Sequence, residues 1–303
     1  MKTLLIGGTG QVGHELARQL PAEELVVTTR SGEVVRDGAD HVALDVTDLD
    51  AIRRLIADLA PARVVNAAAH TAVDRAESEP ELAFRINAEA PRAMAEACAS
   101  LGARLVHYST DYVFDGGGDR PYGVDDATAP PGVYGRSKRA GEEALLDSGA
   151  DVLILRTAWV YGLRGQNFLR TMLRLGAERE ELGVVDDQIG SPTPAWLIAA
   201  VTTQLLDRDE VSGIHHLVAA GRTSWCGFAS AIFDGAVRRG LLQRAPRVKP
   251  IPTSAYPTPA RRPAFSVLDT GDLAGLGIHL PDWRDALETT FDRAGADARA
   301  RLA

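Results

Sequence analysis

Residues 3–13 read Thr-Leu-Leu-Ile-Gly-Gly-Thr-Gly-Gln-Val-Gly, a short apolar run that passes directly into a glycine-rich turn. The spacing Gly7-x-x-Gly10-x-x-Gly13 is a variant of the dinucleotide fingerprint. In that fingerprint glycines permit a tight turn and let a pyrophosphate approach the backbone N–H groups at a helix N-terminus. A plain strand–helix turn could also contain these glycines. Their position in the first turn of an alternating chain favours nucleotide binding.

The segments that follow alternate between patterns typical of buried strands and patterns typical of helices. The expected strands are Thr3–Ile6, Leu25–Thr28, Val64–Asn66, Leu105–Ser109 and Val152–Leu155. The expected helices are Gln11–Leu20, Leu49–Leu59, Pro80–Ser100 and Ser137–Asp147. Such alternation is typical of a parallel sheet with helices on both faces. We therefore expect an α/β fold, a doubly wound parallel (Rossmann) sheet with a smaller, mixed α/β C-terminal lobe.

A chain of 303 residues exceeds what one hydrophobic core comfortably serves, so two coupled lobes are expected. Residues 1–155 are predicted to form the dinucleotide-binding domain, completed by a later segment near 185–220 that includes a strand at His215–Ala219. Residues 156–303 are predicted to form mainly the substrate-binding lobe. Ala245 to Pro263 contains six prolines and is expected to be a long loop.

The composition limits the classes of partner. The 33 basic and 41 acidic residues give a net charge of -8, which disfavours a nucleic-acid partner. No apolar stretch approaches the ~18 residues of a membrane span, and the first apolar run is too short for an export signal. The two cysteines, Cys98 and Cys226, are expected to be buried thiols, which fits a cytoplasmic protein.

The end of the second expected strand indicates which dinucleotide binds. It reads Thr-Thr-Arg30-Ser31, without an acid until Glu33, and an arginine there favours a 2′-phosphate over a free ribose hydroxyl. We therefore expect NADPH, with NADH possible and a solvated Arg30 as the alternative. The other residues expected to contact the cofactor are Gly7, Gly10, Gln11 and Val12 in the glycine loop, and Asp45 and Val46 beside the adenine.

Tyr134 and Lys138 stand four residues apart, a spacing that places both on one face of a helix. A phenol titrates near pH 10, and a nearby ammonium stabilises its ionised form, so the pair can exchange protons with a substrate. The spacing is common by chance. However, Ser109 and Thr110 end an expected strand upstream, at the edge where open α/β sheets bind ligands. Thr110 is expected to hydrogen-bond the reacting carbonyl, unless it only terminates the strand.

In this order, the glycine loop, hydroxyl pair, tyrosine and lysine resemble the extended short-chain dehydrogenase/reductases, and among them the dTDP-4-dehydrorhamnose reductase family. The stretches that carry the resemblance are Gly7–Gly13, Asn66–Asp74, Ser109–Phe114, Tyr134–Lys138, Arg156–Gly162 and Pro257–Pro263. They extend over nearly the whole chain.

The resemblance implies roles for individual residues. It makes Thr110, Tyr134 and Lys138 a catalytic triad, in which Tyr134 and Lys138 also contact the cofactor. It places Ala67, Ala68 and Ala69 along the cofactor, and Thr71, Val73, Thr110 and Asp111 at the sugar. Trp159 resembles a tryptophan that packs on the deoxysugar ring, with a core tryptophan as the alternative. Arg262, in the arginine pair Arg261-Arg262, would bind the substrate pyrophosphate unless it is solvated.

The activity that the resemblance implies is NADPH-dependent reduction of the C4 keto group of dTDP-4-dehydro-L-rhamnose to dTDP-L-rhamnose. The expected partner is therefore a dTDP-keto-sugar. Phe265 stands where the family usually carries Asn, which leaves room for a dTDP-dihydrostreptose synthase-type reductase. An epimerase or dehydratase is a more distant alternative. A regulatory subunit similar to methionine adenosyltransferase beta is the non-enzyme alternative.

A departure from the family concerns metal binding. Some members form dimers around a magnesium ion held by glutamates, and Glu15 matches one such position. Trp196 stands where the second glutamate is expected, and a site without that carboxylate would be a poor one. We therefore expect no magnesium, and a monomer or weak homodimer.

Overall fold

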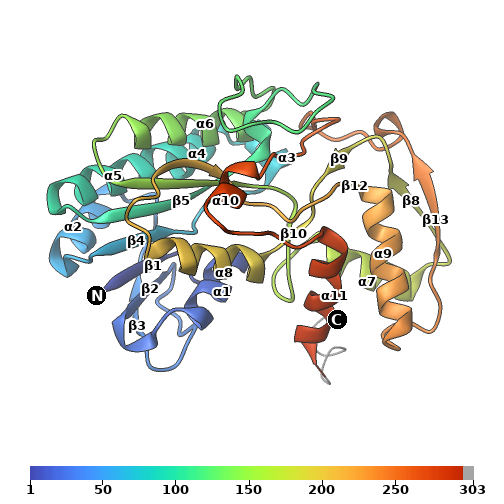
Figure 1. Ribbon diagram of the computed structural model, residues 1–303, viewed down its shortest axis with the longest axis horizontal. Coiled ribbons are helices and arrows are strands. Elements are labelled where there is room, and N and C mark those ends of the chain that lie inside the picture. The colour runs from blue at the N-terminus through green and yellow to red at the C-terminus, as the bar shows by residue number, and fades with distance from the viewer. Residues whose placement is uncertain (296–303) are drawn as a thin grey trace.

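A sheet of seven parallel strands forms the centre of the protein, which a computed structural model describes for residues 1–295 (Figure 1). The strand order is β11-β6-β5-β4-β1-β2-β3, and each neighbouring pair is parallel. The strands are β1 (Thr3–Ile6), β2 (Leu25–Thr29), β3 (Asp40–Ala43), β4 (Arg63–Asn66), β5 (Arg104–Thr110), β6 (Val152–Thr157) and β11 (Gly213–His216). The order reverses between β1 and β4, where such sheets bind dinucleotides, and the predicted doubly wound fold is confirmed.

Helices bury both faces of the sheet. Successive side chains of a strand point to opposite faces. Leu5 of β1 therefore joins the core cluster of α1 (Gln11–Gln19) and α8 (Ala195–Leu206), whereas Leu4 packs with α2 (Leu49–Leu59) and α5 (Ala90–Leu101). In Figure 1, α1 and α8 lie below the sheet, and α2, α5 and α6 (Val133–Leu146) lie on the other side. Burial on both faces explains why the strands are apolar throughout rather than alternating.

The expected helix Pro80–Ser100 contains a break that its apolar pattern did not show. After α3 (Val73–Ser78) the chain forms α4 (Pro80–Phe84), a π-helical turn η2 (Arg85–Glu89) and then α5. A π turn inserts an extra residue and redirects one side chain, and such turns are frequent at functional sites. Here Asn87 is fully buried in that turn.

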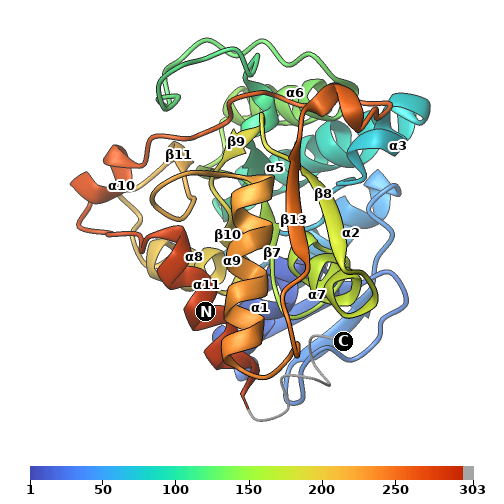
Figure 2. The same cartoon turned by 90° about the vertical axis from the view of Figure 1, so that its right-hand side faces the viewer.

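The C-terminal lobe combines short strand pairs with helices (Figure 2). Its strands are β7 (Val160–Tyr161), β8 (Glu181–Val185), β9 (Ile189–Gly190), β10 (Thr193–Pro194), β12 (Thr223–Ser224) and β13 (Arg247–Ile251). Its helices are α7 (Phe168–Glu178), α9 (Trp225–Arg238), α10 (Gly271–Gly275) and α11 (Trp283–Ala294). Short 3-10 turns are η1 (Ala22–Glu24), η3 (Asp111–Val113) and η4 (Thr253–Ala255). The exact domain boundaries stay a prediction.

The prediction of a continuous loop from Ala245 to Pro263 is wrong in its first part. Residues 247–251 form β13, which pairs in parallel with β8. A two-stranded ribbon consists of edge strands, so Pro250 can occupy a position that needs no N–H donor. Similarly, the late strand β11 begins at Gly213 and ends at His216, earlier than the expected His215–Ala219.

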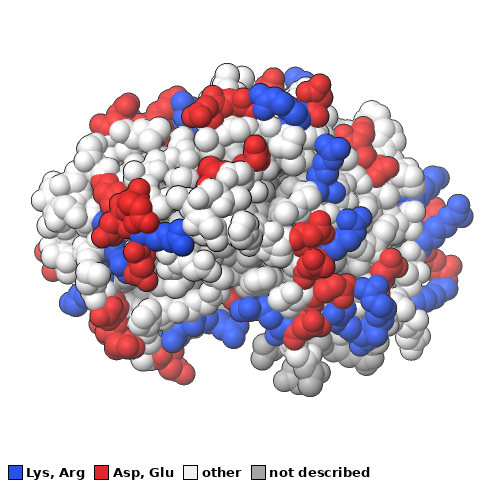
Figure 3. Space-filling model, viewed as in Figure 1, with Lys and Arg blue, Asp and Glu red and all other residues white. Residues whose placement is uncertain are grey.

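The distribution of surface charge and the burial of the cysteines agree with what the composition predicts. Acidic and basic side chains lie interspersed on the face shown in Figure 3, with uncharged residues between them. Cys98 and Cys226 are both buried free thiols, as expected. Within residues 1–295, every helix is too short or too polar to span a lipid bilayer.

Candidate active site

The glycine loop between β1 and α1 leaves its helix N-terminus open. Gly10 caps α1 without any side-chain hydrogen bond, so the first N–H groups of the helix remain available to an anion. Gly7 has a φ of 89°, and a Cβ there would lie 2.7 Å from the backbone nitrogen of Ala68. A Cβ at Gly13 would lie 2.2 Å from the carbonyl oxygen of Gly7. Only glycine therefore permits this close approach.

Replacing Gly13 with Ala is expected to displace the loop. The added methyl must push back a backbone carbonyl, which should lower the free energy of unfolding by about 1–3 kcal/mol and weaken NADPH binding. Chemical denaturation and a fluorescence titration with NADPH measure the two effects. Gly275→Ala is the matched control, because no atom lies within 4 Å of its Cβ position. Equal behaviour of the two variants would show that the loop tolerates the methyl.

A cavity of about 350 Å³ adjoins the glycine loop at the switch point of the sheet. Its lining includes seven of the residues expected to bind the cofactor: Gly7, Gly10, Arg30, Val46, Ala67, Ala68 and Ala69. Thr9, Thr28, Thr29, Leu44 and Ile86 complete the lining. Among residues 1–295 Arg30 is exposed and forms no ion pair, so its guanidinium is available to a phosphate at this edge. The glycine cradle and the arginine fit a dinucleotide that carries a 2′-phosphate.

Four other expected cofactor residues lie outside the lining of this cavity. The Gln11 side chain accepts a hydrogen bond from Asn167, and Val12 packs against the core. Ser31 donates to a carboxylate of Glu33 at 3.4 Å. Asp45 accepts two hydrogen bonds from Thr47, which hold the pKa of its carboxyl below the usual value. Contacts of these four residues with a cofactor stay a prediction.

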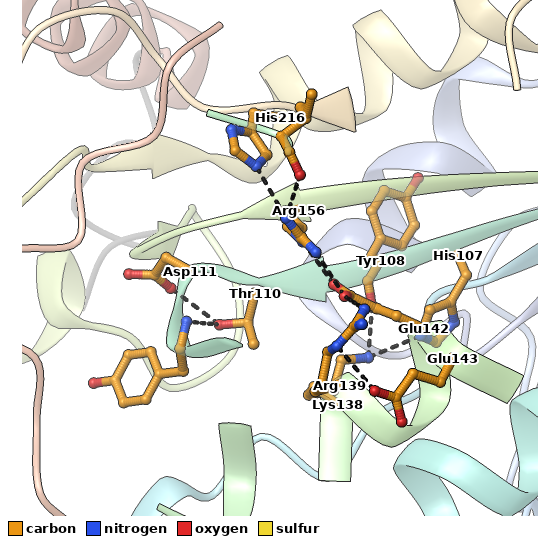
Figure 4. A network of polar contacts seen from close by, with 12 residues as sticks. His107, Tyr108, Thr110, Asp111, Lys138, Arg139, Glu142, Glu143, Arg156 and His216 are labelled. Atoms are coloured by element: carbon orange, nitrogen blue, oxygen red, sulfur yellow. Dashed lines mark hydrogen bonds and ion pairs between the residues drawn. The ribbon is translucent and has the colours of Figure 1, made fainter. Parts of the chain in front are cut away.

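The three expected catalytic residues come from two neighbouring elements. Thr110 ends β5, and Tyr134 and Lys138 lie one turn apart on α6. The Thr110 hydroxyl donates to the Asp111 carboxylate at 3.0 Å (Figure 4). Burial raises the pKa of Tyr134 to about 12, against an opposing effect of the Thr110 hydroxyl. The ring of Tyr112 packs edge-on against Tyr134 at 5.6 Å and helps to fix its orientation.

Lys138 is almost completely buried against β5. Its Nζ lies 2.6 Å from the carbonyl oxygen of Tyr108 and 3.0 Å from Nε2 of His107 (Figure 4). Burial lowers the pKa of Lys138 to about 8, although the charge of Glu142 opposes the shift. His107 was not predicted from the sequence, because a lone histidine in an apolar strand carries no distinguishing signal.

Asp111 is a buried carboxyl directly after the catalytic strand, with an exposed fraction of 2%. Burial raises its pKa to about 6, while the hydroxyls of Ser266 and Thr110 oppose that shift. A carboxylate in this position is a strong acceptor for a sugar hydroxyl. Its burial beside Thr110 supports the predicted sugar contact without establishing it.

Trp159 has an unusual backbone and a stacked ring. Its φ of 47° lies in the left-handed region, where bulky residues are rare. The indole stacks on Trp225 with ring centroids 3.5 Å apart and an interplanar angle of 3°. Gly190 also lies against it, because a Cβ there would be 2.4 Å from the ring. The packed-core interpretation thus holds for the face that Trp225 covers, and contact between Trp159 and a sugar stays a prediction.

The expected pyrophosphate ligand Arg262 already has a partner. Its guanidinium makes two hydrogen bonds to Asp74, at 3.0 and 2.7 Å, and a third to Thr258. This pairing connects the proline-rich loop to α3, which begins at Val73. The sequence did not predict it, because the partners are 188 residues apart. Thr71, immediately before α3, is exposed.

A buried ion pair connects α6 to the sheet (Figure 4). Arg156 on β6 makes two hydrogen bonds of 2.8 Å to the two carboxylate oxygens of Glu142 on α6. The side chains of Arg156 and Glu142 are 2% and 0% exposed. Arg156 also donates to the carbonyl oxygen of Val124, so the pair ties the loop after β5 to the same helix.

Asn87, in the π-helical turn, forms a second buried connection to α6. Its carboxamide bonds both the N–H and the C=O of His70, and its Nδ2 donates to Ser137 at 3.0 Å. The π turn therefore holds the segment after β4, which lines the cofactor cavity, against the catalytic helix. This residue was also missed, because the π turn is not visible in the sequence.

The surroundings of Glu15 differ from a carboxylate-rich metal site. Arg293 lies 4.0 Å from the Glu15 carboxylate and 5.0 Å from the ring of Trp196. Among residues 1–295, no three His, Cys, Asp or Glu side chains group so as to hold a metal ion. The Arg293 guanidinium therefore lies beside Glu15, and the expectation that no magnesium binds there stays a prediction.

Comparisons with known proteins agree with the geometry. The family model described as "RmlD substrate binding domain" matches residues 1–295. The dTDP-4-dehydrorhamnose reductase of Escherichia coli K12 is 46% identical over 290 residues, covering 94% of this chain and 95% of that one. The reductase of Burkholderia thailandensis is 48% identical, covering 95% and 97%. The crystal structure of the Bacillus anthracis reductase in complex with NADP has a TM-score of 0.88 at 34% identity, covering 97% and 100%. The chain therefore belongs to the dTDP-4-dehydrorhamnose reductase family.

Proposed function

We propose that this protein uses NADPH to reduce the C4 keto group of dTDP-4-dehydro-L-rhamnose, giving dTDP-L-rhamnose. The observation that carries the proposal is a shared sheet edge in a chain of this family: Thr110 ends β5, the neighbour of β4, and Ala67–Ala69 after β4 line the cavity. Tyr134 and Lys138 lie on α6, which packs against β5. The cavity accounts for the cofactor: it has a glycine cradle at the α1 N-terminus and an available guanidinium on Arg30. A relative with the same fold is described in complex with NADP.

The chain's own side chains have distinct roles in this reduction. NADPH, held by the glycine loop, Ala67–Ala69 and Arg30, supplies the hydride when bound. The Thr110 hydroxyl holds the substrate carbonyl oxygen, and the Tyr134 phenol gives its proton to that oxygen as it becomes an alkoxide. Lys138 fixes the cofactor ribose and stabilises the resulting phenolate.

The electrostatics of Tyr134 suit proton donation. Its pKa of about 12 keeps the phenol protonated at neutral pH. A proton donor must begin the reaction in its acid form, and this shift keeps Tyr134 in that form. Asp111 and Thr71 are the residues we assign to the sugar hydroxyls, with Val73 and the exposed part of Trp159 against the apolar face of the ring. Arg262 would exchange its bond to Asp74 for the substrate pyrophosphate.

The alternatives differ in product or in turnover. A dTDP-dihydrostreptose synthase-type enzyme would oxidise NADPH but yield a ring-contracted sugar. Phe265 allows this alternative, because the family usually carries Asn at this position. The ring of Phe265 lies 5.9 Å from the guanidinium carbon of Arg222. An epimerase or dehydratase would show no net NADPH oxidation. A regulatory subunit would bind a partner protein without turnover. We further propose a monomer or weak homodimer, because Arg293 and Trp196 surround Glu15.

A consumption assay with both cofactors tests the proposal. Purified enzyme and dTDP-4-dehydro-L-rhamnose should oxidise NADPH faster than NADH at equal concentrations, and NMR should identify dTDP-L-rhamnose as the product. Because Arg30 is exposed at the cavity edge, we expect an NADPH preference in kcat/KM of about tenfold or more. A clear preference for NADH would contradict the role of Arg30. Absence of oxidation with either cofactor would contradict the proposed activity.

A further inference from the structure

A chain of buried hydrogen bonds leads from the cofactor cavity to Lys138. The backbone N–H of Ala68, which lines the cavity, donates to Oδ1 of Asn66 at 3.1 Å. Nδ2 of Asn66 lies 3.0 Å from Nδ1 of His107, and Nε2 of His107 lies 3.0 Å from Nζ of Lys138. Each of these three residues is 1% exposed, so the network lies out of contact with bulk solvent.

The positions of the protons along this chain follow from its donors and acceptors. The N–H of Ala68 requires the carboxamide oxygen of Asn66, so the NH₂ group of Asn66 faces His107. Nδ1 of His107 must then be the acceptor, and a neutral imidazole carries its single proton on Nε2. Burial is the main cause that holds the pKa of His107 well below its ordinary value, so the ring is neutral. Its Nε2–H group therefore points at Lys138.

Lys138 can accept this proton donor only in its amine form. An ammonium group has three N–H donors and no lone pair. An ammonium on Lys138 would therefore point an N–H donor at the Nε2–H donor of His107, with no acceptor between them. The amine has one lone pair for His107 and two N–H groups, one of which bonds the carbonyl oxygen of Tyr108. The other is left for a cofactor hydroxyl. The hydrogen bonds in the structure are thus those of the amine state, which Lys138 adopts above its pKa of about 8. The ammonium, which prevails below that pH, is the form that stabilises the Tyr134 phenolate.

We propose that His107 is a positioning residue that controls the protonation of Lys138 through its tautomer, and that Asn66 fixes this tautomer from the cofactor side. Protonating Lys138 requires the imidazole proton to move to Nδ1. The Asn66 carboxamide must then rotate, which breaks its bond to the N–H of Ala68. The proton on Lys138 and the backbone along the cofactor are therefore coupled. The functional consequence rests on the role proposed above for Lys138.

The other charged residues around Lys138 cannot take over the effect of His107 on its protonation. Glu142, on the same helix, raises the pKa of Lys138, but its carboxylate is bound by Arg156 of β6. Asp111 in η3 accepts a hydrogen bond from the Thr110 hydroxyl. Glu77 on α3 accepts one from the backbone N–H of Val133, at the start of α6. Charged residues on the remaining elements against α6 are Glu81 on α4, Arg85 and Glu89 in η2, and Arg92 and Glu96 on α5. Among residues 1–295, His107 is the titratable side chain hydrogen-bonded to Nζ.

Nitrogen NMR of histidine-labelled wild-type enzyme tests the tautomer directly. The measurement is made at about pH 9, above the pKa of about 8 of Lys138, so that the amine form prevails. The resonances of His107 are identified as those lost in His107→Phe. We expect the Nε2–H tautomer. The Nδ1–H tautomer or an imidazolium at this pH would overturn the proposal, and neither result depends on turnover.

Asn66→Asp tests the coupling. A carboxylate accepts from both the N–H of Ala68 and Nδ1–H of His107, so the tautomer should switch and Nε2 should become an acceptor for the Lys138 ammonium. The pKa of Lys138 then rises, and the fall of kcat/KM at alkaline pH should move upward by about one pH unit. When Asn66→Asp is made in the His107→Phe variant, the fall of kcat/KM at alkaline pH should stay at the pH where His107→Phe alone shows it. An equal shift without His107 would contradict transmission through the ring.

His216→Phe is the matched control for removing a buried histidine. His216 is also fully buried at a strand end, but its ring lies 3.0 Å from the carbonyl oxygen of Asp269 and 3.5 Å from Nη1 of Arg156, and it makes no bond to Lys138. This variant should leave the alkaline limb at its wild-type position even if stability falls. If His216→Phe moved the alkaline limb of kcat/KM by as much as Asn66→Asp does, a general packing effect rather than the proposed one would be shown. If no variant or wild type turns over substrate, the proposed function fails, whereas the NMR result still decides the tautomer.

Discussion

Tyr134→Phe lowers kcat by about 100-fold or more, because the variant has no proton to give to the developing alkoxide. The substitution removes a single oxygen and keeps the ring. The edge-on packing against Tyr112, at 5.6 Å, should therefore persist. Lys138 also keeps its bonds to His107 and Tyr108, so the cofactor ribose should still be held. Hence the affinity for NADPH should change little while the chemical step slows.

The measurement for Tyr134→Phe is steady-state NADPH oxidation with the keto-sugar, together with a binding titration for NADPH. Tyr112→Phe is the matched control, because it removes a buried phenol oxygen from the neighbouring ring. Tyr112 has its pKa raised by burial, and we assign it no proton transfer. The control should lose less than about tenfold in kcat. Full activity of Tyr134→Phe would contradict the assignment of Tyr134 as the proton donor.

Arg156→Met should lower the free energy of unfolding by about 3–5 kcal/mol. The substitution removes the two 2.8 Å hydrogen bonds from the buried Glu142 carboxylate, which keeps one hydrogen bond of 3.1 Å from Arg139. Although burial opposes it, Arg156 holds the pKa of Glu142 below the ordinary value in the wild-type protein. With only Arg139 as a charged partner, Glu142 takes up a proton more readily or shifts outward, and either change disturbs the helix that carries Tyr134 and Lys138. Urea denaturation measures the loss.

The double variant Glu142→Leu/Arg156→Met separates a missing attraction from an uncompensated charge. Apolar residues of similar volume often replace a buried ion pair at little cost or even with a gain. We therefore expect the double variant to be more stable than Arg156→Met alone. If the double variant were as unstable as the single one, packing rather than the unpaired carboxylate would explain the loss.

The central sheet was predictable because its signals are local. The expected strand Thr3–Ile6 matches β1 residue for residue, and the helix Leu49–Leu59 matches α2. Each depends on an unbroken apolar or periodic pattern between clear turn residues. Thr110 and the glycine loop could be placed at one edge of the sheet, because parallel strands end on the same side.

The rest of the site depends on contacts that leave no local pattern. Asn66 and His107 are polar residues in apolar strands, and their bond is visible only when β4 and β5 are adjacent. Asn87 is directed inward by a π turn, which the apolar spacing on either side conceals. The pair of Asp74 and Arg262 joins distant parts of the chain, so neither residue indicates the other. Pro250 obscured β13, because proline argues against a strand except at an edge.

Transfer of an isotope from the cofactor to the sugar tests the reductase assignment most directly. The enzyme is supplied with dTDP-4-dehydro-L-rhamnose and with NADPH that carries deuterium at the transferable position of the nicotinamide. We expect dTDP-L-rhamnose with deuterium at C4 of the sugar, detected by NMR. A product without deuterium at C4, or a converted sugar with no oxidation of the cofactor, would contradict the reductase assignment.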